Sequence, residues 1–437
     1  MRNIALIIFS FIFTLGFSQD ETPNPLLTED IEAQQKWVDS IYNAMTPKER
    51  VGQLFMVQAF SNKGFKHENQ ISAMIQNYHI GGVIYSKSGP THQIKLDNNL
   101  QSLSKVPLLI GMDAEWGLSM RLDSTYAFPW NMTLGAVSDN KLIEQVGYQI
   151  GEHCKRVGVH FNFAPVVDIN TNPKNPIIGN RSFGEDKDNV TDKAAAFMKG
   201  MQAAGVLANA KHFPGHGDTD ADSHKTLPTV NFNKQRIDSV ELYPYRKLIK
   251  EGLSSVMVAH LNIPGLNIRN GLPTSLSKYV VTDLLKEDLG FKGLIFTDAL
   301  TMKGAADFVQ SGIDGNTTKK MDTRGEIDLM AFNAGNDVML MSESVPKGIE
   351  KILEAYEKGD ITEDRLAHSV KKILMAKYKV GLQDYKPISY RGVDKDIIRP
   401  IDDFLSGRLL EEAITVLKNK NNILPFQNLE TKKILLV

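Results

Sequence analysis

Apolar residues along the chain gather in eight short runs, and each run ends in polar residues. The runs cover 53–58, 82–86, 108–113, 160–168, 206–211, 255–260, 293–298 and 337–341. They are continuous rather than alternating, which indicates strands buried on both faces in a parallel sheet. A new run starts on average about every 40 residues, the length of one βα unit with its loops.

Helical patterns separate these runs. The clearest cover 140–157, 192–204, 234–251, 278–289 and 325–334, and a glycine stands where each should stop. Eight βα units fit a (β/α)8 barrel, the TIM barrel of the α/β class. The alternative is a doubly wound open sheet, but residues 58–63 hold no glycine-rich nucleotide loop after the first strand.

The first residues have the features of an export signal. A short positive stretch precedes an apolar run over 4–17, and Gly16 and Ser18 place small residues before a cleavage point. The run is shorter than the about 20 residues that a membrane span needs. We expect a signal peptide over 1–18, an exported protein in the periplasm or outside the cell, and no stable membrane span after cleavage. An uncleaved anchor is the alternative.

The rest of the chain divides into three parts. We expect the barrel over 30–380, with two further helices in 345–380, and a polar linker over 381–403. Residues 404–417 then predict a helix and 432–437 a strand. A lone strand has nothing to pair with. We therefore expect 404–437 to begin a second α/β domain in a longer protein.

Composition narrows the class of partner. The 437 residues carry 50 Lys and Arg against 51 Asp and Glu, a net charge of −1. This balance gives no basic footprint for nucleic acid and no polybasic patch for anionic lipid. The single cysteine, Cys154, excludes an internal disulfide and a cysteine-based zinc site. It shares an apolar helical stripe with Val146 and Ile150, so we expect it to be buried.

Polar residues recur where the predicted strands end. They are Asp113, Glu115, Asp168, Lys211, His212, His260 and Asp298. Any one of them could simply cap its strand and pair with a neighbour. In a barrel, however, the carboxyl ends of all strands meet at the face that carries the active site. Five strands that deliver such groups to one rim favour a site for a polar substrate.

The segment after the fifth run holds three histidines and three aspartates, and three chemistries compete for it. A metal site of His212, His216 and His224 matches no helical ligand spacing and would place a lysine beside the ion. A Schiff base on Lys211 would need a desolvated pocket, which the polar run disfavours. Acid/base work by Asp222 and His224 fits best, because residues two apart in an extended loop face the same side. No metal or cofactor is signalled.

A resemblance bears on this choice. Lys211-His-Phe-Pro-Gly-His-Gly, followed after four residues by Asp222-Ser-His224, resembles the signature of glycoside hydrolase family 3 β-N-acetylglucosaminidases. The stretches 163–168, 180–184, 293–302 and 334–337 also match, so the resemblance covers roughly 40–380. The tail from Phe404 resembles the entry into the second, α/β sandwich domain of longer members.

The resemblance implies an activity and a mechanism. The family removes terminal β-linked N-acetylglucosamine with retention, usually from peptidoglycan fragments, through a covalent glycosyl-enzyme. Its nucleophile corresponds to Asp298 and its general acid/base to His224, which Asp222 orients. A histidine in this role departs from the usual pair of carboxylates in glycosidases. No cofactor is implied.

Sugar-binding roles carry over to five residues of the matching motifs. They are Asp113, Arg121, Arg181, Lys211 and His212, and charged groups with several donors or acceptors suit a hydroxyl-rich ring. His216 and Asp218 are expected to shape the loop rather than touch the substrate.

The chain departs from the family around the third strand. The motif is Asp113-Ala-Glu-Trp-Gly-Leu-Ser-Met-Arg121, whereas the common form has glycine at Trp116 and arginine at Leu118. Trp116 could stack on a sugar or merely pack at the rim. The natural aglycone, a muropeptide or a chitin oligosaccharide, is therefore open.

Other functions compete with the leading one. A β-glucosidase or a glycoside phosphorylase of the same family is the first alternative, although β-glucosidases generally lack the Asp-Ser-His motif. A non-catalytic sugar-binding barrel is the second. The oligomeric state cannot be derived from these patterns.

Overall fold

The fold was analysed in a computed structural model, which describes residues 22–221, 226–266, 269–310, 324–431 and 433. The predicted signal peptide over 1–18, the acid/base candidates Asp222 and His224, and all but Lys433 of the predicted strand over 432–437 lie outside these residues. The structure therefore does not test the predictions made for these three segments.

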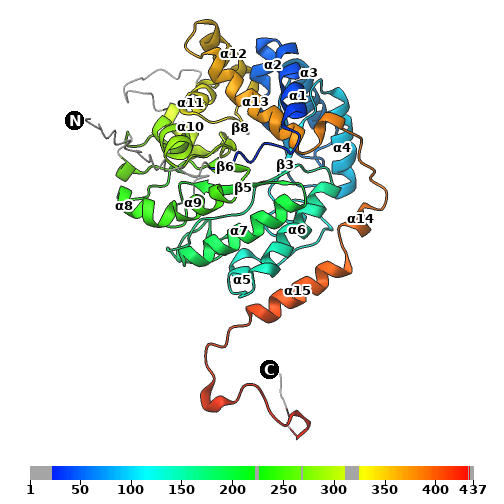
Figure 1. Ribbon diagram of the computed structural model, residues 1–437, viewed down its shortest axis with the longest axis vertical. Coiled ribbons are helices and arrows are strands. Elements are labelled where there is room, and N and C mark those ends of the chain that lie inside the picture. The colour runs from blue at the N-terminus through cyan, green and yellow to red at the C-terminus, as the bar shows by residue number, and fades with distance from the viewer. Residues whose placement is uncertain (1–21, 222–225, 267–268, 311–323, 432, 434–437) are drawn as a thin grey trace, which may run out of the picture.

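Eight parallel strands form a barrel, as the sequence predicts (Figure 1). They are β1 Phe55–Ala59, β2 Gly82–Tyr85, β3 Leu109–Met112, β4 Phe161–Asn162, β5 Leu207–Phe213, β6 Ser255–Val258, β7 Leu294–Thr297 and β8 Met339–Leu340. Each strand pairs with the next in the chain, and β8 pairs with β1. A parallel bridge between Phe296 and Val338 joins β7 to β8 and closes the barrel.

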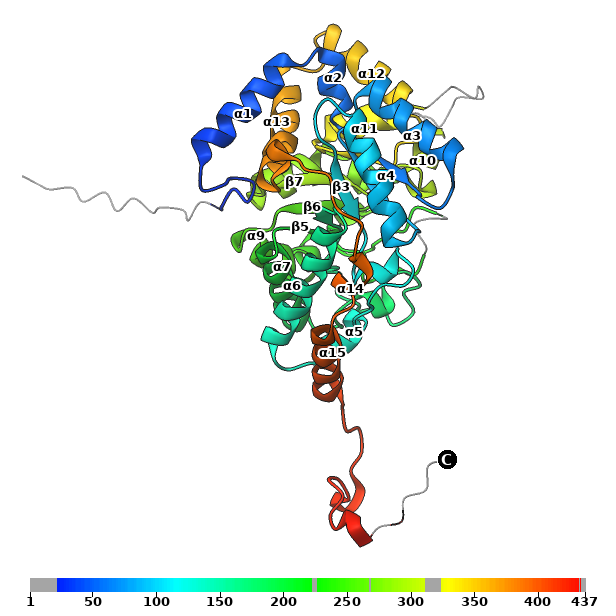
Figure 2. The same ribbon diagram turned by 90° about the vertical axis from the view of Figure 1, so that its right-hand side faces the viewer.

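Helices surround the strands (Figures 1 and 2). They are α1 Ile31–Ala44, α2 Pro47–Gly52, α3 Phe65–Tyr78, α4 Pro90–Leu103, α5 Asn131–Gly135, α6 Asn140–Arg156, α7 Lys187–Ala203, α8 Lys234–Arg236, α9 Tyr243–Lys250, α10 Lys303–Gln310, α11 Glu326–Ala334, α12 Val345–Glu357, α13 Glu363–Lys379, α14 Val393–Asp396 and α15 Pro400–Ala413. A wider helix over Tyr279–Asp288 precedes β7. None of the described helices is both long and apolar enough to cross a membrane.

Aromatic rings fill the barrel interior. The rings of Phe161, Phe163 and Phe296 lie 4.7–5.3 Å apart. A Cβ at Gly111 of β3 would come within 2.9 Å of Phe163 and 3.4 Å of Met56 on β1. Because β1 and β3 are not neighbours, these side chains meet inside the barrel. The core is therefore packed solid beneath the face that carries the site.

Prolines explain two departures from the predicted elements. The strand predicted over 160–168 is regular only at Phe161–Asn162, because Pro165 has no N–H to donate to a ladder. The single helix predicted over 234–251 is divided into α8, a wide turn over Ile237–Glu241 and α9. Pro244 leaves the carbonyl four residues earlier without its usual donor, and the wide turn absorbs this gap.

The last helices begin and end earlier than predicted. α15 spans Pro400–Ala413 rather than 404–417, and the short α14 lies within the predicted linker. Pro400 occupies the first turn, where its missing N–H costs nothing. The β-branched run from Ile414 to Val416 then disfavours the helix. α15 packs against α5 and α6. Cys154 of α6 is fully buried, as predicted.

Candidate active site

A cavity of about 460 Å³ opens at the carboxyl ends of the strands. Its polar lining comprises Gln58, Asp113, Arg121, Arg181, Lys211, His212, His216, Asp298 and Thr301. All five residues predicted to bind sugar are therefore brought together with the predicted nucleophile. The volume suits a single sugar ring with its substituents.

Lys211 and Asp113 line the cavity, and Glu115, which does not line it, pairs with Lys211. The Lys211 ammonium donates to Asp113 Oδ1 at 2.8 Å and lies 2.8 Å from Glu115 Oε1. Arg121 donates to the other oxygen of Asp113 at 2.5 Å. Arg181 donates to both oxygens of Glu115, at 2.7 and 3.0 Å. Three cations and two carboxylates thus hold one another in fixed positions.

These contacts control the protonation of both carboxyl groups. Burial alone would raise their pKa values, but the adjacent cations outweigh it. Arg181 and Lys211 lower the pKa of Glu115 to about 2. Lys211 and Arg121 hold the pKa of Asp113 well below its usual range. Both groups are therefore ionised at neutral pH.

Asp168 orients His212. Its Oδ2 lies 2.6 Å from His212 Nδ1, and its Oδ1 accepts the backbone N–H of His216 at 2.7 Å. Because Nδ1 is engaged by a carboxylate, the Nε2 of His212 is the nitrogen that faces the cavity. It lies 3.4 Å from Arg181. Burial would raise the pKa of Asp168, but His212 and His216 hold it below its ordinary value.

Asp298 follows β7 and stands at the cavity wall. Its backbone N–H donates to Val258 O at 2.9 Å, and its Oδ1 accepts the N–H of Ala299 at 2.8 Å. Burial would raise the pKa of this carboxyl, but the positive potential of His260, His212 and Lys211 holds it below its ordinary value. Asp298 is therefore an anion that is fixed in direction and open to the cavity.

His260 has a role that the sequence did not suggest beyond its place at a strand end. Its Nδ1 lies 2.6 Å from Ser275 Oγ and its Nε2 lies 3.0 Å from Ala299 O. Ala299 directly follows Asp298. The fully buried imidazole thus pins the turn that presents the predicted nucleophile. From the sequence, Glu115 and Asp168 could be recognised only as residues at strand ends. The structure shows that Glu115 holds Arg181 and that Asp168 holds His212.

His216 lines the cavity, although we expected it to shape the loop. It does both. Its Nδ1 lies 2.7 Å from Thr219 Oγ1, and its buried Nε2 has no hydrogen-bond partner among the described residues. Burial and the nearby His212 lower the pKa of His216 to about 4, so it is neutral at pH 7. Asp218 accepts from Thr171 at 2.8 Å and supports the loop, as expected.

In the sequence, Asp222 and His224 follow Thr219. Their positions lie outside the described residues, so their distance from Asp298 is not part of this geometry. Of the chain that the structure describes, no group of three or more His, Cys, Asp and Glu is arranged to hold a metal ion.

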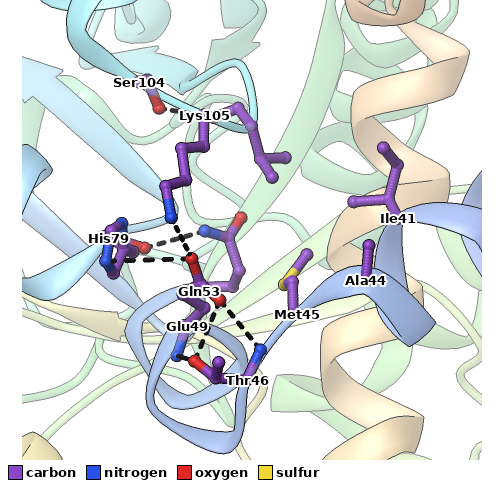
Figure 3. A pocket seen from close by; sticks show the side chains of 10 residues that line it. Ile41, Ala44, Met45, Thr46, Glu49, Gln53, His79, Ser104 and Lys105 are labelled. Carbon is purple, nitrogen blue, oxygen red and sulfur yellow. Dashed lines mark hydrogen bonds and ion pairs between the residues drawn. The ribbon is translucent and has the colours of Figure 1, made fainter.

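A second cavity, of about 420 Å³, lies at the opposite end of the barrel (Figure 3). Gln53 and Ser104 precede β1 and β3, so the cavity is at the amino ends of the strands. Its charges are satisfied locally, because Lys105 pairs with Glu49 at 2.7 Å and Glu49 caps α2. Active sites of this fold occupy the other face.

The chain matches the glycosyl hydrolase family 3 N-terminal domain over residues 46–376. Among curated proteins, it is 32% identical over 391 residues to a protein of Pseudoalteromonas piscicida named beta-hexosaminidase A. This match covers 82% of the chain and 62% of that protein. The chain thus spans less than two thirds of this relative.

Solved structures agree with the fold. A family 3 beta-N-acetylglucosaminidase from a Paenibacillus strain superposes with a TM-score of 0.76 and 34% identity, over 86% of the chain and 70% of that protein. A beta-glucoside phosphorylase superposes with a TM-score of 0.82 and 25% identity, over 93% and 71% respectively.

Proposed function

The chain belongs to glycosyl hydrolase family 3, and we propose from this premise that it is a retaining exo-β-N-acetylglucosaminidase. One observation carries the proposal. Asp298 is an ionised carboxylate at the wall of the cavity, and Arg121, Arg181 and Lys211 line the same cavity. The names of the relatives support an N-acetylhexosaminide as substrate.

The reaction proceeds by two displacements. In the first, an oxygen of Asp298 attacks the anomeric carbon, and the bond to the leaving oxygen breaks as His224 gives that oxygen a proton. In the second, His224 takes a proton from water, whose oxygen displaces Asp298 and restores the carboxylate. Both displacements invert the anomeric carbon, so the product keeps the β configuration. Asp222 orients the imidazole of His224.

The charged residues that line the cavity bind the sugar ring during these steps. Asp113, Lys211 and Arg121 present a fixed set of charged groups to the sugar hydroxyls, and His212 and Arg181 add further hydrogen-bonding groups beside them. Since these groups already bind one another, they lose little freedom when the substrate arrives. Met257 and Met302 supply apolar surface within the same cavity.

The resemblance of residues 1–18 to a signal peptide suggests the compartment in which the enzyme encounters its substrate. An exported protein encounters peptidoglycan fragments in the periplasm or outside the cell, and these fragments contain β-linked N-acetylglucosamine. We propose them as the natural source of substrate. Chitin oligosaccharides offer the same linkage.

Purified protein should release phenol from an aryl β-N-acetylglucosaminide and leave the aryl β-glucoside largely intact. His224→Ala should reduce turnover far more for a poor leaving group than for a good one, because only the poor one needs the proton. Equal losses on both substrates would contradict the acid role. No phenol release by a protein with a native circular dichroism spectrum would contradict the activity.

Phosphorolysis is a second candidate, favoured by the high structural similarity to a beta-glucoside phosphorylase. In that reaction, phosphate replaces water in the second displacement. Stimulation of turnover by phosphate, with a sugar 1-phosphate as product, would establish it. A free sugar as the product at every phosphate concentration would exclude it.

A further inference from the structure

Two tryptophans stack on each other, and each directly adjoins a residue that contacts Arg181 of the cavity. The ring centroids of Trp116 and Trp130 are 4.2 Å apart and their planes are inclined by 25°. Trp130 is 45% exposed and Trp116 is half-buried. The outer face of an indole that is this open is available for contact with a ligand.

The stacked pair is joined to the cavity wall on both sides. Trp116 directly follows Glu115, whose carboxylate holds Arg181. Asn131 directly follows Trp130 and donates its side-chain amide to Arg181 O at 2.7 Å. Consecutive Cα atoms are about 3.8 Å apart. Each tryptophan is therefore one residue away from a contact with Arg181, which lines the cavity.

The loop that carries the pair is held firmly. Trp116 O accepts the backbone N–H of Phe128 at 2.9 Å. Gly117 has a φ of +105°, and a Cβ there would lie 2.8 Å from Tyr126 O. The rings of Tyr126 and Phe128 pack 5.0 Å apart within the same loop. The platform is thus already formed before a ligand arrives, which reduces the entropy lost on binding.

We propose that Trp116 and Trp130 form a second sugar-binding site, which takes the ring on the leaving-group side of the bond that is cleaved. The proposal rests on the proposed function. Neither tryptophan lines the cavity itself, so the pair cannot serve the ring that reacts with Asp298. A pyranose presents C–H groups on its faces and hydroxyls at its edge. Its face can cover the exposed indole while its hydroxyls stay in water.

This assignment makes the chain selective for saccharides of at least two rings. The common family sequence has glycine at Trp116, which leaves nothing to stack there. If Trp116 served only to pack the loop, its partner Trp130 would not need to be exposed. The enzyme would then show no preference for longer saccharides. The two interpretations therefore differ in the effect of removing the exposed ring.

Trp130→Ala tests the proposal by kinetics on chitobiose. The KM for chitobiose should rise about tenfold, which corresponds to about 1.4 kcal/mol. Inhibition by N-acetylglucosamine, which occupies the cavity alone, should stay within about twofold of wild type, since the cavity contacts are unchanged. Trp130→Phe should restore most of the affinity. Tyr148→Ala, at a 41% exposed tyrosine on α6, is the matched control and should change neither quantity.

Fluorescence adds a readout that does not depend on turnover. The chain has three tryptophans, and the third, Trp37, packs against Tyr378 far along the chain on α13. In the Asp298→Asn variant, chitobiose should change tryptophan emission more strongly than N-acetylglucosamine does. Adding Trp130→Ala should abolish that difference, whereas adding Trp37→Phe should preserve it.

An unchanged KM for chitobiose in Trp130→Ala would overturn the second site, as would an equal rise in the inhibition constant of N-acetylglucosamine. Failure of the proposed function has another signature. In that case the wild-type chain neither hydrolyses chitobiose nor binds N-acetylglucosamine, and the second site falls with it.

Discussion

Glu115 joins two of the predicted sugar-binding residues, Lys211 and Arg181, to each other. It is fully buried, and its two oxygens hold the ammonium of Lys211 and the guanidinium of Arg181. Removal of one partner from such a network leaves the remaining charges unbalanced in a region that water cannot reach. The positions of Lys211 and Arg181, which we predict to bind the sugar, therefore depend on a residue that does not itself line the cavity.

Glu115→Gln should lower kcat/KM for an aryl N-acetylglucosaminide by about 100-fold, since two cations lose their anchor. It keeps the shape of the side chain and removes only its charge. Steady-state kinetics and thermal unfolding measure the two consequences together. Glu357→Gln, at an exposed position on α12, is the control. Kinetics equal to wild type in Glu115→Gln would contradict the anchoring role.

At the residue scale, the rule that strand ends build the site placed Asp113, Lys211 and Asp298 in one cavity. It could not show which polar residues bind substrate and which hold others in place. That distinction depends on side-chain directions, as with His260, whose two nitrogens are both engaged away from the cavity. The stacking of Trp130 on Trp116 was likewise not readable, because 13 residues of irregular loop separate them.

At the scale of elements, a buried polar contact helps to fix α15 to the barrel. Asp402 Oδ2 lies 3.1 Å from His153 Nε2 of α6, and both side chains are almost wholly buried. The same oxygen accepts the backbone N–H of Arg399 at 2.9 Å and caps the helix. Phe404, by contrast, is 65% exposed. The helix therefore depends on this contact as well as on apolar packing.

Asp402→Asn should loosen α15 and leave the barrel intact. Hydrogen bonds to charged groups contribute about 1.5–3 kcal/mol, so amide exchange in α15 should accelerate at least about tenfold. Hydrogen–deuterium exchange with mass spectrometry measures this against peptides from α6. Glu411→Gln on the exposed side of α15 should leave exchange unchanged. Exchange in Asp402→Asn at the wild-type rate would contradict the role of this contact in holding the helix.

Element positions were more predictable than their ends. All eight strands lie within the predicted runs or one to two residues beyond them, since buried parallel strands are continuous apolar stretches. The residue at which a helix or strand begins or ends depends on individual side chains. Pro400 begins α15 although it resembles a linker residue, and Pro165 stops β4 within an apolar run.

At the scale of the whole molecule, the barrel carries the candidate active site at one end and a buried lysine at the other. Lys377 of α13 is buried at that end and donates to Gln53 Oε1 at 2.7 Å. Burial lowers the pKa of Lys377 to about 7. In the unfolded chain, the same ammonium keeps its ordinary pKa of about 10.4.

This difference predicts how stability changes with pH. Between pH 7 and about 10, the unfolded chain binds a proton at Lys377 that the folded chain has released. The free energy of unfolding therefore rises with pH, by up to about 1.4 kcal/mol per unit from this group. In the Lys377→Met variant, the free energy of unfolding should not show this rise with pH. Denaturant unfolding of both proteins at pH 7, 8 and 9 measures the difference, and parallel curves would contradict the buried charge.

The most direct test of the account concerns Asp298. A 5-fluoro-N-acetylglucosaminyl fluoride has a good leaving group and slow hydrolysis of the intermediate, so it should accumulate as a covalent adduct. Digestion and mass spectrometry should find one fluorinated sugar on the peptide that contains Asp298, and none in Asp298→Asn. An adduct on another residue, or none from a preparation that turns over aryl N-acetylglucosaminide, would contradict the assignment of Asp298 as nucleophile.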